Sequence, residues 1–401
     1  MKRVLFVHDH IFKYRGDAYY SGGGLPAAIW PRYLQVFPSL TVVGRDGGAL
    51  IEGEEGYTLS SASGVDFCLL PGISNLKSLL LGHAGVEAVC RSLVADSEGV
   101  IARLPSRLGH LFVKEAKRQG KPYAVEVVGC AWGSLWDHGS WKGKFLAPIE
   151  ALKTRQAVAS APFALYVTEK FLQKRYPCKV GVTTFCSNVN IQPVADEVLF
   201  ARQRRIESHK TKIVIGLIGN YSSKYKGIDV AIRAMALADE KLPEWEFQVV
   251  GSGDASAYID LAHKLGVDEK VKFVGTKPSG SAIYEWLDTV DLYLQPSFQE
   301  GLPRALVEAM SRGCPAVATS IAGIPELLKG SEMIAAGDHA TLSSKILALL
   351  QDNGAMLRLA RENFERAQSY YQPVLDTRRT TFWSSFGQYI ASNRNRPVNR
   401  T

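Results

Sequence analysis

Hydrophobic and polar positions alternate in blocks along the whole chain, with short apolar runs separated by longer amphipathic stretches. This pattern is typical of parallel sheets that are covered by helices. Strands are expected at 4–7, 40–43, 67–70, 100–102, 124–128 and 164–167, and again at 213–218, 247–250, 271–274, 292–295 and 316–318. Two such series predict an α/β protein with two doubly wound domains.

The length of the chain supports the same division. A single hydrophobic core stops growing at about 250–300 residues, and this chain has 401. The join is expected near 192–212, where a basic run precedes the restart of the strand pattern. The predicted domains are therefore 1–195 and 205–371, and the polar tail 394–401 is expected to be frayed.

Composition excludes several classes of protein. Hydrophobic residues at 46% and charged residues at 21% are ordinary globular values, so wholesale disorder is excluded. No apolar run approaches the roughly 20 residues of a membrane helix, and 4–7 is too short for a signal-peptide core. A cytoplasmic location is expected. The six cysteines form no CxxC pair, which predicts free thiols and neither a disulfide framework nor a zinc site.

The net charge of +8 is concentrated in one region, because residues 101–180 contain 14 basic and 5 acidic residues. Such a region suits nucleic acid, an anionic membrane or a phosphorylated substrate. It contains no helix-turn-helix, zinc-finger or base-stacking signature, so nucleic acid is ranked last. Phe112 and Phe145 lie among cations, as in interfacial helices. A core-facing helix with a solvated polar face is the alternative.

The most informative segment is 295–315, which predicts a strand, a turn and a helix. The strand should end at Gln295. Pro303 is expected at the first helical position, where no hydrogen bond is lost, and Gly313 with Pro315 should end the helix. The N–H groups of the residues just before the helix would then lie at the carboxyl end of a strand.

Such N–H groups form a site for an anion or a polar ligand. They belong to Gly301 and Leu302, with Glu300 before them and Glu308 further along the helix. Two carboxylates placed in this way can accept hydrogen bonds from a ligand with many hydroxyls. Taken singly, Glu300 could simply interact with the helix dipole and Glu308 could be a solvated helix residue.

The string Ser-Phe-Gln-Glu-Gly-Leu-Pro and the E-x7-E spacing closely resemble the retaining nucleotide-sugar glycosyltransferases of family four, which have the GT-B fold. The resemblance is strong over 210–330 and weaker elsewhere. It implies two Rossmann-like domains facing a central cleft, with a helix at about 372–393 crossing back onto the N-terminal, acceptor-side domain. It also implies that Glu300, Gly301 and Leu302 hold the donor sugar, while Glu308 binds the ribose.

Upstream, residues 215–227 resemble the family's strand and basic phosphate loop. Lys226 matches the family pattern and is assigned to catalysis together with Glu300. Asn220 stands where the family usually has arginine, which removes one positive charge from the diphosphate site. Lys224 is expected to compensate.

Two further loops resemble donor-binding loops of the family. Gly275 and Lys277 follow an expected strand and resemble the loop beside the nucleobase, where backbone groups do the binding. Gly23 and Gly24 resemble the glycine turn that faces the diphosphate. Glycines there would allow close approach of the backbone and positive φ.

On the acceptor side, Val128 stands where many relatives have a histidine near the sugar. His138, close to Trp132 in the sequence, is a candidate substitute, and both are assigned to the acceptor side. His8-Asp9-His10 could indicate a metal site, but a polar patch at a strand end is preferred. No metal and no cofactor are expected.

The resemblance implies transfer of a sugar from a nucleotide diphosphate to a hydroxyl, with retention at the anomeric carbon. The expected acceptor is a glycan or lipid-linked glycan in bacterial surface polysaccharide assembly, with possible peripheral binding at the inner face of the membrane. An inverting enzyme would instead need an acid or base such as Asp9, Asp17 or Asp137. A nucleotide-sugar epimerase and a non-catalytic sugar-nucleotide binding subunit of the same fold also stay open.

Overall fold

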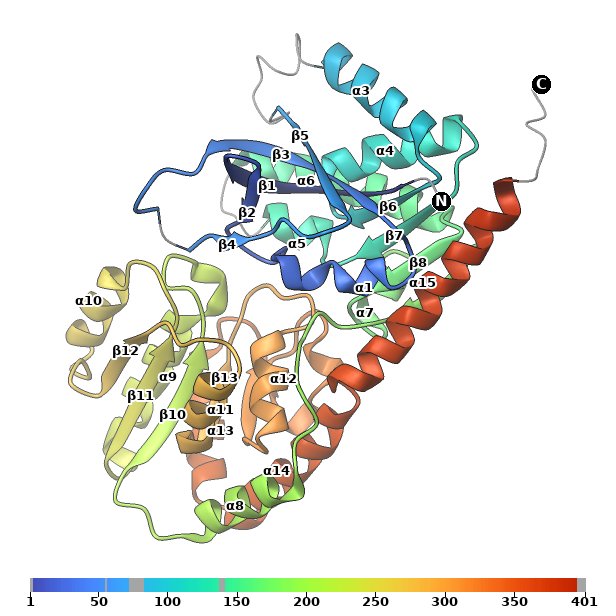
Figure 1. The fold of residues 1–401 in the computed structure, drawn as a ribbon. Helices are drawn as coiled ribbons and strands as arrows, with labels where there is room; N and C mark the ends of the chain where they lie inside the picture. The colour runs from blue at the N-terminus through green and yellow to red at the C-terminus, as the bar shows by residue number, and fades with distance from the viewer. Residues whose placement is uncertain (1–2, 55, 72–82, 137–140, 395–401) are drawn as a thin grey trace. The chain divides into compact units, whose positions relative to one another are not determined.

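A computed structural model describes residues 3–54, 56–71, 83–136 and 141–394 (Figure 1). The chain divides into two compact units. Unit 1 comprises Met1–Cys186 and Asp376–Thr401, and unit 2 comprises Ser187–Leu375. In the described part of the chain, no helix is both long enough and apolar enough to cross a bilayer. All six cysteines are free thiols, as expected.

Unit 1 is built on one sheet, which has nine strands in the described residues. These are β1 Val4–Arg15, β2 Ala18–Ser21, β3 Leu40–Ala49, β4 Thr58–Leu59, β5 Val65–Leu70, β6 Gly99–Leu104, β7 Tyr123–Val127, β8 Phe163–Tyr166 and β9 Val182–Phe185. Strand β1 pairs in parallel with β3 on one side and with β6 on the other. The chain runs outward through β3 and β5 and then returns to β6, so the winding direction reverses between β1 and β6.

Helices pack on this sheet (Figure 1). They are η1 Ala27–Ile29, α1 Pro31–Leu34, α3 His83–Asp96, α4 Arg107–Arg118, α5 Ala131–Trp136, α6 Trp141–Ala159, α7 Phe171–Arg175 and the last helix, α15 Gln372–Arg394. The N-cap of α4 is Ser106, whose Oγ accepts a hydrogen bond from the Gly109 N–H at 2.9 Å. A serine there satisfies one of the unpaired donors of the first helical turn.

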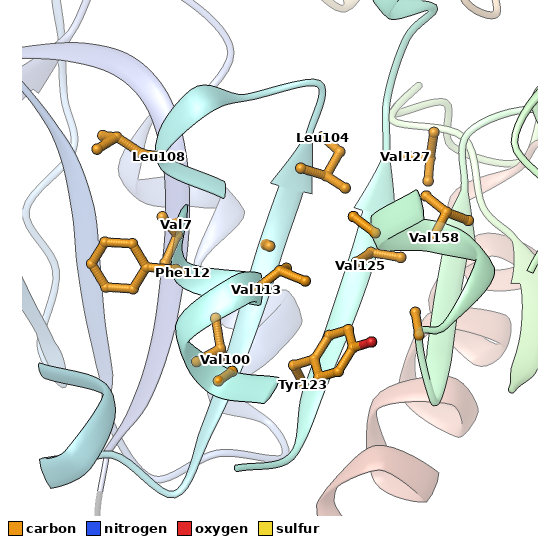
Figure 2. Packing of buried hydrophobic residues seen from close by; sticks show 14 of the residues in the cluster. Val7, Val100, Leu104, Leu108, Phe112, Val113, Tyr123, Val125, Val127 and Val158 are labelled. Carbon is orange, nitrogen blue, oxygen red and sulfur yellow. The ribbon is translucent and has the colours of Figure 1, made fainter. Parts of the chain in front are cut away.

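The buried face of α4 corrects one expectation. Phe112 is fully buried and points toward Val7 of β1 (Figure 2). It therefore contributes to the core and does not form an interfacial surface, so the core-facing alternative is right for this residue. The side chain of Phe145 lies outside the described residues.

The apolar face of α15 completes the core of unit 1. Trp383, Phe386 and Ile390 are buried, and the Trp383 ring lies 5.4 Å from that of Tyr33. The helix packs closely against Gly99, because a Cβ there would lie 2.8 Å from Ile390 Cδ1. The helix expected at about 372–393 spans Gln372–Arg394.

Unit 2 contains a six-stranded parallel sheet in the order β12-β11-β10-β13-β14-β15. The strands are β10 Ile213–Ile218, β11 Trp245–Val250, β12 Val271–Gly275, β13 Leu292–Gln295, β14 Ala316–Thr319 and β15 Met333–Ile334. The helices are α8 Asp196–Glu207, η2 Lys224–Lys226, α9 Ile228–Ala238, η3 Asp239–Lys241, α10 Ser256–Lys264, α11 Ser281–Thr289, α12 Arg304–Ser311, η4 Ile324–Glu326, η5 Gly330–Glu332, α13 His339–Leu350 and α14 Asn353–Gln368. The winding direction reverses between β10 and β13, which is where open α/β sheets bind ligands.

All eleven expected strands are present, but the expected join between domains is a helix. The basic run 201–205 lies within α8. Arg202 in that run is 3% exposed, and it donates hydrogen bonds to the Leu287 and Arg312 carbonyls at 2.7 and 3.1 Å. These carbonyls lie near the C-terminal ends of α11 and α12, where a cation is favourable. The boundary between the units falls earlier, at Cys186.

Candidate functional site

The site in unit 2 is built around the carboxylate of Glu300, just beyond the end of β13. Its Oε1 accepts hydrogen bonds from Lys226 Nζ at 2.8 Å, Ser297 Oγ at 2.8 Å and Gln295 Nε2 at 3.0 Å. The Glu300 side chain is 9% exposed. In the part of the chain that the structure describes, Oε2 has no hydrogen-bond partner. One oxygen is thus fixed by three donors, and the other keeps its full capacity to accept hydrogen bonds.

Buried polar side chains hold this carboxylate in place. Gln295 and Ser297 are fully buried, and Gln295 Oε1 accepts a hydrogen bond from the Tyr293 hydroxyl at 3.1 Å. The Tyr293 hydroxyl in turn accepts from the Ile218 N–H at 3.3 Å. This connected network links the ends of β10 and β13, and such networks restrict the orientation of every member. Sequence reasoning missed Gln295, Ser297 and Tyr293 as positioning residues.

The loop after β10 brings Lys226 to Glu300. Lys226 closes the short helix η2, and Gly227 follows it with φ 68°. A Cβ on Gly227 would lie only 2.0 Å from the Pro296 carbonyl oxygen, so only glycine allows the loop to approach the end of β13 this closely. The two residues that sequence analysis assigned to catalysis therefore form an ion pair. An ammonium has three donors, and Glu300 uses one of them.

Gly301 and Leu302 lie between Glu300 and α12. In the described residues, neither N–H donates a hydrogen bond to the protein. The expected helix is present, with Leu306, Val307 and Met310 fully buried. Pro303 was predicted at the first helical position, but it is the N-cap, with ψ 108°. The extended backbone at Pro303 keeps the two preceding amides outside the helix while leaving them at its N-terminal end.

Glu308 lies one turn inside α12 and is partly buried. Burial raises its pKa above the ordinary value, and Arg304 lowers it by a smaller amount. Its carboxylate has no hydrogen-bond partner in the described residues. Burial raises the pKa of the Tyr293 hydroxyl well above its ordinary value, and the negative charges of Glu308 and Glu300 raise it further. The E-x7-E spacing thus directs both carboxylates toward the region between β10 and β13.

The raised pKa of Glu308 has a defined effect on stability. A carboxyl group with a higher pKa in the folded state stabilises the fold below its unfolded pKa of about 4.3. That contribution is lost as pH rises through the folded pKa. We therefore expect Glu308→Gln to raise the melting temperature of the ligand-free protein at pH 7 and not at pH 4. Exposed Glu240 provides the control: Glu240→Gln should change neither value, and equal gains at both pH values would contradict this account.

Known proteins resemble this chain in the segment that contains the site. The model for the family "Glycosyl transferases group 1" matches residues 212–352, which include Lys226, Glu300 and Glu308. Protein CapJ of Staphylococcus aureus is 35% identical over 326 residues, which are 80% of this chain and 79% of the relative. The chain belongs to the group 1 glycosyltransferases. It is an enzyme of that group, and the expected GT-B fold class is confirmed.

This glycosyltransferase is also similar to a second relative in sequence and to a solved structure. The amylovoran biosynthesis glycosyltransferase AmsK of Erwinia amylovora is 31% identical over 176 residues, or 41% of this chain and 39% of the relative. Among solved structures, HepE of Anabaena in complex with UDP has a TM-score of 0.63 at 16% identity. That match covers 98% of this chain and 99% of HepE, and it concerns the fold.

The other donor residues expected in this glycosyltransferase occupy the loops of unit 2. Asn220 Oδ1 accepts a hydrogen bond from the Ser222 N–H at 2.9 Å and so shapes the turn after β10. Lys224 is exposed and Lys277 is partly buried, and neither forms an ion pair within the described ranges. Gly275 ends β12 with φ 76°. Its N–H donates to the Tyr221 hydroxyl at 3.1 Å, and its carbonyl accepts from Gly251 at 3.0 Å.

The glycine turn of unit 1 differs from expectation in two respects. It follows β2, which the sequence did not predict, instead of the first strand. Gly23 and Gly24 do not have positive φ, and Pro26, just before η1, has an extended backbone. Nothing lies within 4 Å of a Cβ built on Gly24, whereas one on Gly23 would lie 3.6 Å from His10 Cε1.

The acceptor-side candidates lie in unit 1. The Arg175 guanidinium lies over the Trp132 ring at 5.7 Å, and His138 is outside the described residues. Val128 follows β7 and packs partly buried against the core. Asp9 is a poor candidate for an acid or base, because its carboxylate accepts hydrogen bonds from the N–H groups of Arg107 and Leu108 at 2.5 and 3.0 Å. The Asp9 carboxylate instead caps the first turn of α4 by accepting these hydrogen bonds.

Proposed function

We propose that this glycosyltransferase transfers a sugar from a nucleotide-diphosphate donor to a hydroxyl of a glycan or lipid-linked glycan, with retention at the anomeric carbon. The observation that carries the proposal is the geometry around Glu300. Its Oε1 is held by three donors, and Oε2 is left for a ligand. Sugar hydroxyls are the natural donors for a carboxylate oxygen that is fixed in this way.

The same site offers positive charge for the diphosphate. Lys226 has two N–H donors besides the one that Glu300 accepts. The N–H groups of Gly301 and Leu302 lie just before the N-terminus of α12. Preorganised donors of this kind stabilise negative charge that develops in a transition state. These groups support a reaction that does not depend on a metal ion. As the bond between the anomeric carbon and the β-phosphate oxygen breaks, the acceptor oxygen forms a bond to that carbon on the same face of the sugar. The proton of the acceptor hydroxyl passes to the β-phosphate oxygen of the leaving nucleoside diphosphate.

Glu308 is proposed to bind the ribose. Its unpartnered carboxylate is partly buried, so ribose hydroxyls would restore hydrogen bonds that burial has removed. We expect Glu308→Ala to weaken binding of a nucleoside diphosphate by at least about tenfold, because a hydrogen bond to a charged group contributes about 1.5 kcal/mol or more. Calorimetry with UDP, GDP and ADP would identify the base and measure the loss. Unchanged affinity would remove Glu308 from the nucleotide site, and Glu240→Ala is the control.

A transfer assay tests the reaction itself. Purified protein, nucleotide sugar and candidate acceptors should give a glycoside that retains the anomeric configuration of the donor, as read by NMR, and chelators should not reduce the rate. Inversion would contradict the mechanism. Release of an altered sugar without an acceptor would support an epimerase. Binding without turnover on any acceptor would support a non-catalytic subunit.

A role in surface polysaccharide biosynthesis is proposed from similarity to the relatives. AmsK is named for amylovoran biosynthesis, and this chain is 35% identical to CapJ over most of both lengths. Polysaccharides of this type are assembled on hydroxyl acceptors, in accordance with the donor site described above. The cytoplasmic location expected from the sequence belongs to the same proposal.

Peripheral binding to an anionic membrane is proposed for a groove between α4 and α6. The groove has a volume of about 680 Å³. Apolar side chains such as Leu111 and Ile149 line it beside three lysines, which are Lys114, Lys117 and Lys153. Ile149 is 50% exposed. An apolar surface beside cations matches the chemistry of an anionic lipid interface.

Liposome sedimentation tests the groove. We expect binding to anionic vesicles at low ionic strength that falls as salt screens the charges. Replacing Lys114, Lys117 and Lys153 with glutamine should abolish it. The control replaces three exposed lysines of unit 2, Lys241, Lys264 and Lys272, and removes the same charge. Equal partitioning to neutral and anionic vesicles, or equal losses in both triple variants, would disprove the groove as the binding surface.

A further inference from the structure

A second set of charged side chains lies in unit 1, where the winding direction of its sheet reverses. Strand β6 pairs with β1 through Val7 and Ala102, so His8 and Arg103 are the next residues along these neighbouring strands. The ring of His10 lies 6.4 Å from that of His8, and Arg45 comes from β3 on the other side of β1. Ligands bind beyond the carboxyl ends of strands at such a position.

Arg103 has a buried guanidinium without a hydrogen-bonded partner. The residue is 9% exposed, and its Nε is buried with no hydrogen-bond partner among the described residues. The nearest carboxylate oxygen is Glu126 Oε2 at 3.7 Å, which accepts a hydrogen bond from the Tyr33 hydroxyl at 3.0 Å. Burial of a charge without hydrogen bonds is costly, so the guanidinium retains strong capacity for an acceptor.

Arg45 adds a second positive charge that no carboxylate neutralises through a hydrogen bond. Its Nε donates to the Asp9 backbone carbonyl at 2.7 Å, while the Asp9 carboxylate is occupied by the first turn of α4. The remaining nitrogens of Arg45 have no partner in the described part of the chain. Arg45 is only partly buried and is therefore more accessible than Arg103.

Two neutral imidazoles complete the cluster. Burial, and then Arg103 and Arg45, lower the pKa of His10 to about 4. Burial first, then Arg103, also lowers the pKa of His8 well below its ordinary value. Both rings are thus uncharged at neutral pH, and His8 Nδ1 is buried without a hydrogen-bond partner among the residues described. The guanidiniums disfavour a metal cation at this histidine pair and favour an anion.

We propose that Arg103 and Arg45 bind an anionic group of the acceptor, a phosphate or a carboxylate. His8 Nδ1 lies in the same cluster as an additional hydrogen-bonding group. The inference rests on the proposed function, because it assigns this part of unit 1 to the acceptor. Planar guanidinium groups match the oxygens of phosphate and carboxylate through paired N–H donors. The acceptor class is accordingly a sugar phosphate or a uronic acid-containing glycan, whereas an uncharged glycan would bring no anionic oxygen to either guanidinium.

Calorimetry on the full chain at constant ionic strength tests this assignment. The probes are glucose 6-phosphate, methyl glucuronoside and uncharged methyl glucoside, each titrated with and without a saturating nucleoside diphosphate. We expect one or both anionic probes to bind and the uncharged probe to bind at least about tenfold more weakly, as expected for the loss of a charge-assisted hydrogen bond. Binding of the phosphate but not the uronate, or the reverse, identifies the anionic group.

Three variants locate the site. Arg45→Gln and Arg103→Lys should each weaken the anionic probe at least about tenfold, whereas Arg155→Gln, at an exposed position of α6, removes a charge without effect. Arg103→Lys keeps the charge and loses the fork. If Arg103→Lys does not fold because Arg103 is buried, Arg45→Gln still tests the proposal.

Two results would overturn the inference. One is failure of both anionic probes to bind better than methyl glucoside. The other is an equal loss of nucleoside diphosphate affinity in Arg45→Gln, which would assign the cluster to the donor diphosphate. If the unaltered protein binds no nucleoside diphosphate, the proposed donor site is contradicted instead. The titrations with the anionic probes would still test whether Arg45 and Arg103 bind an anion.

Discussion

Replacing Lys226 with methionine is expected to lower kcat by about 10²–10³-fold, the usual effect of removing one preorganised donor from a developing negative charge. The negative charge on the leaving diphosphate grows as the sugar–phosphate bond breaks. Lys226 therefore contributes more to the transition state than to the bound donor, and KM should change less than kcat. Steady-state kinetics with a nucleotide sugar and its acceptor would measure both quantities.

A double variant at the ion pair separates the loss of catalysis from a loss of stability. Lys226 is hydrogen-bonded to Glu300 at 2.8 Å, and the two side chains are 17% and 9% exposed. Lys226→Met leaves that carboxylate without its counter-ion and should destabilise the fold. The double variant Lys226→Met/Glu300→Gln removes both charges and should recover stability. Recovery of turnover together with the melting temperature would show that the single variant had lost only its fold.

Glu300→Gln is expected to lower kcat/KM for the intact nucleotide sugar by about 10²-fold, while free nucleoside diphosphate binds normally. The amide oxygen can accept from Lys226, Ser297 and Gln295 in place of Oε1. The amide nitrogen then occupies the position of Oε2 and presents donors where the sugar hydroxyls need an acceptor. Losing two hydrogen bonds to a charged group, at about 1.5 kcal/mol each, corresponds to that factor.

Paired titrations separate the possible results. Calorimetry should show weaker binding of the nucleotide sugar and unchanged binding of the corresponding nucleoside diphosphate. Glu326→Gln, at an acidic residue of η4 in the same unit, serves as the comparison. If Glu300→Gln weakens both ligands equally, Glu300 contacts the nucleotide and the sugar lies elsewhere.

The sequence predicted the parts of the fold that depend on local periodicity. The runs at 213–218 and 292–295 match the bounds of β10 and β13, because buried parallel strands have continuous apolar sequences. The strands that were missed, such as β4 and β9, are short and largely exposed. Their pairing depends on neighbours that are distant in sequence, so the local pattern contains little evidence for them.

The same distinction applies to the site. The motif from Glu300 to Glu308 is local in sequence, and so it could be identified along with Lys226. The ion pair between Lys226 and Glu300 joins residues that are 74 positions apart. Its geometry follows from the pairing of β10 with β13 and from the close approach at Gly227. Arg45 and Arg103 had no motif, and only the pairing of β1 with β3 and β6 brings them together.

Helix α15 has a consequence for the order in which the chain folds during synthesis. Unit 2 is one continuous segment, Ser187–Leu375, whereas unit 1 also needs residues after Asp376. Trp383, Phe386 and Ile390 fill its core and are translated only after the whole of unit 2. Domains usually fold as they emerge, starting from the N-terminus. Here the unit whose translation begins first completes its core last. Until α15 is made, the apolar surface that it covers stays exposed to solvent and accessible to chaperones.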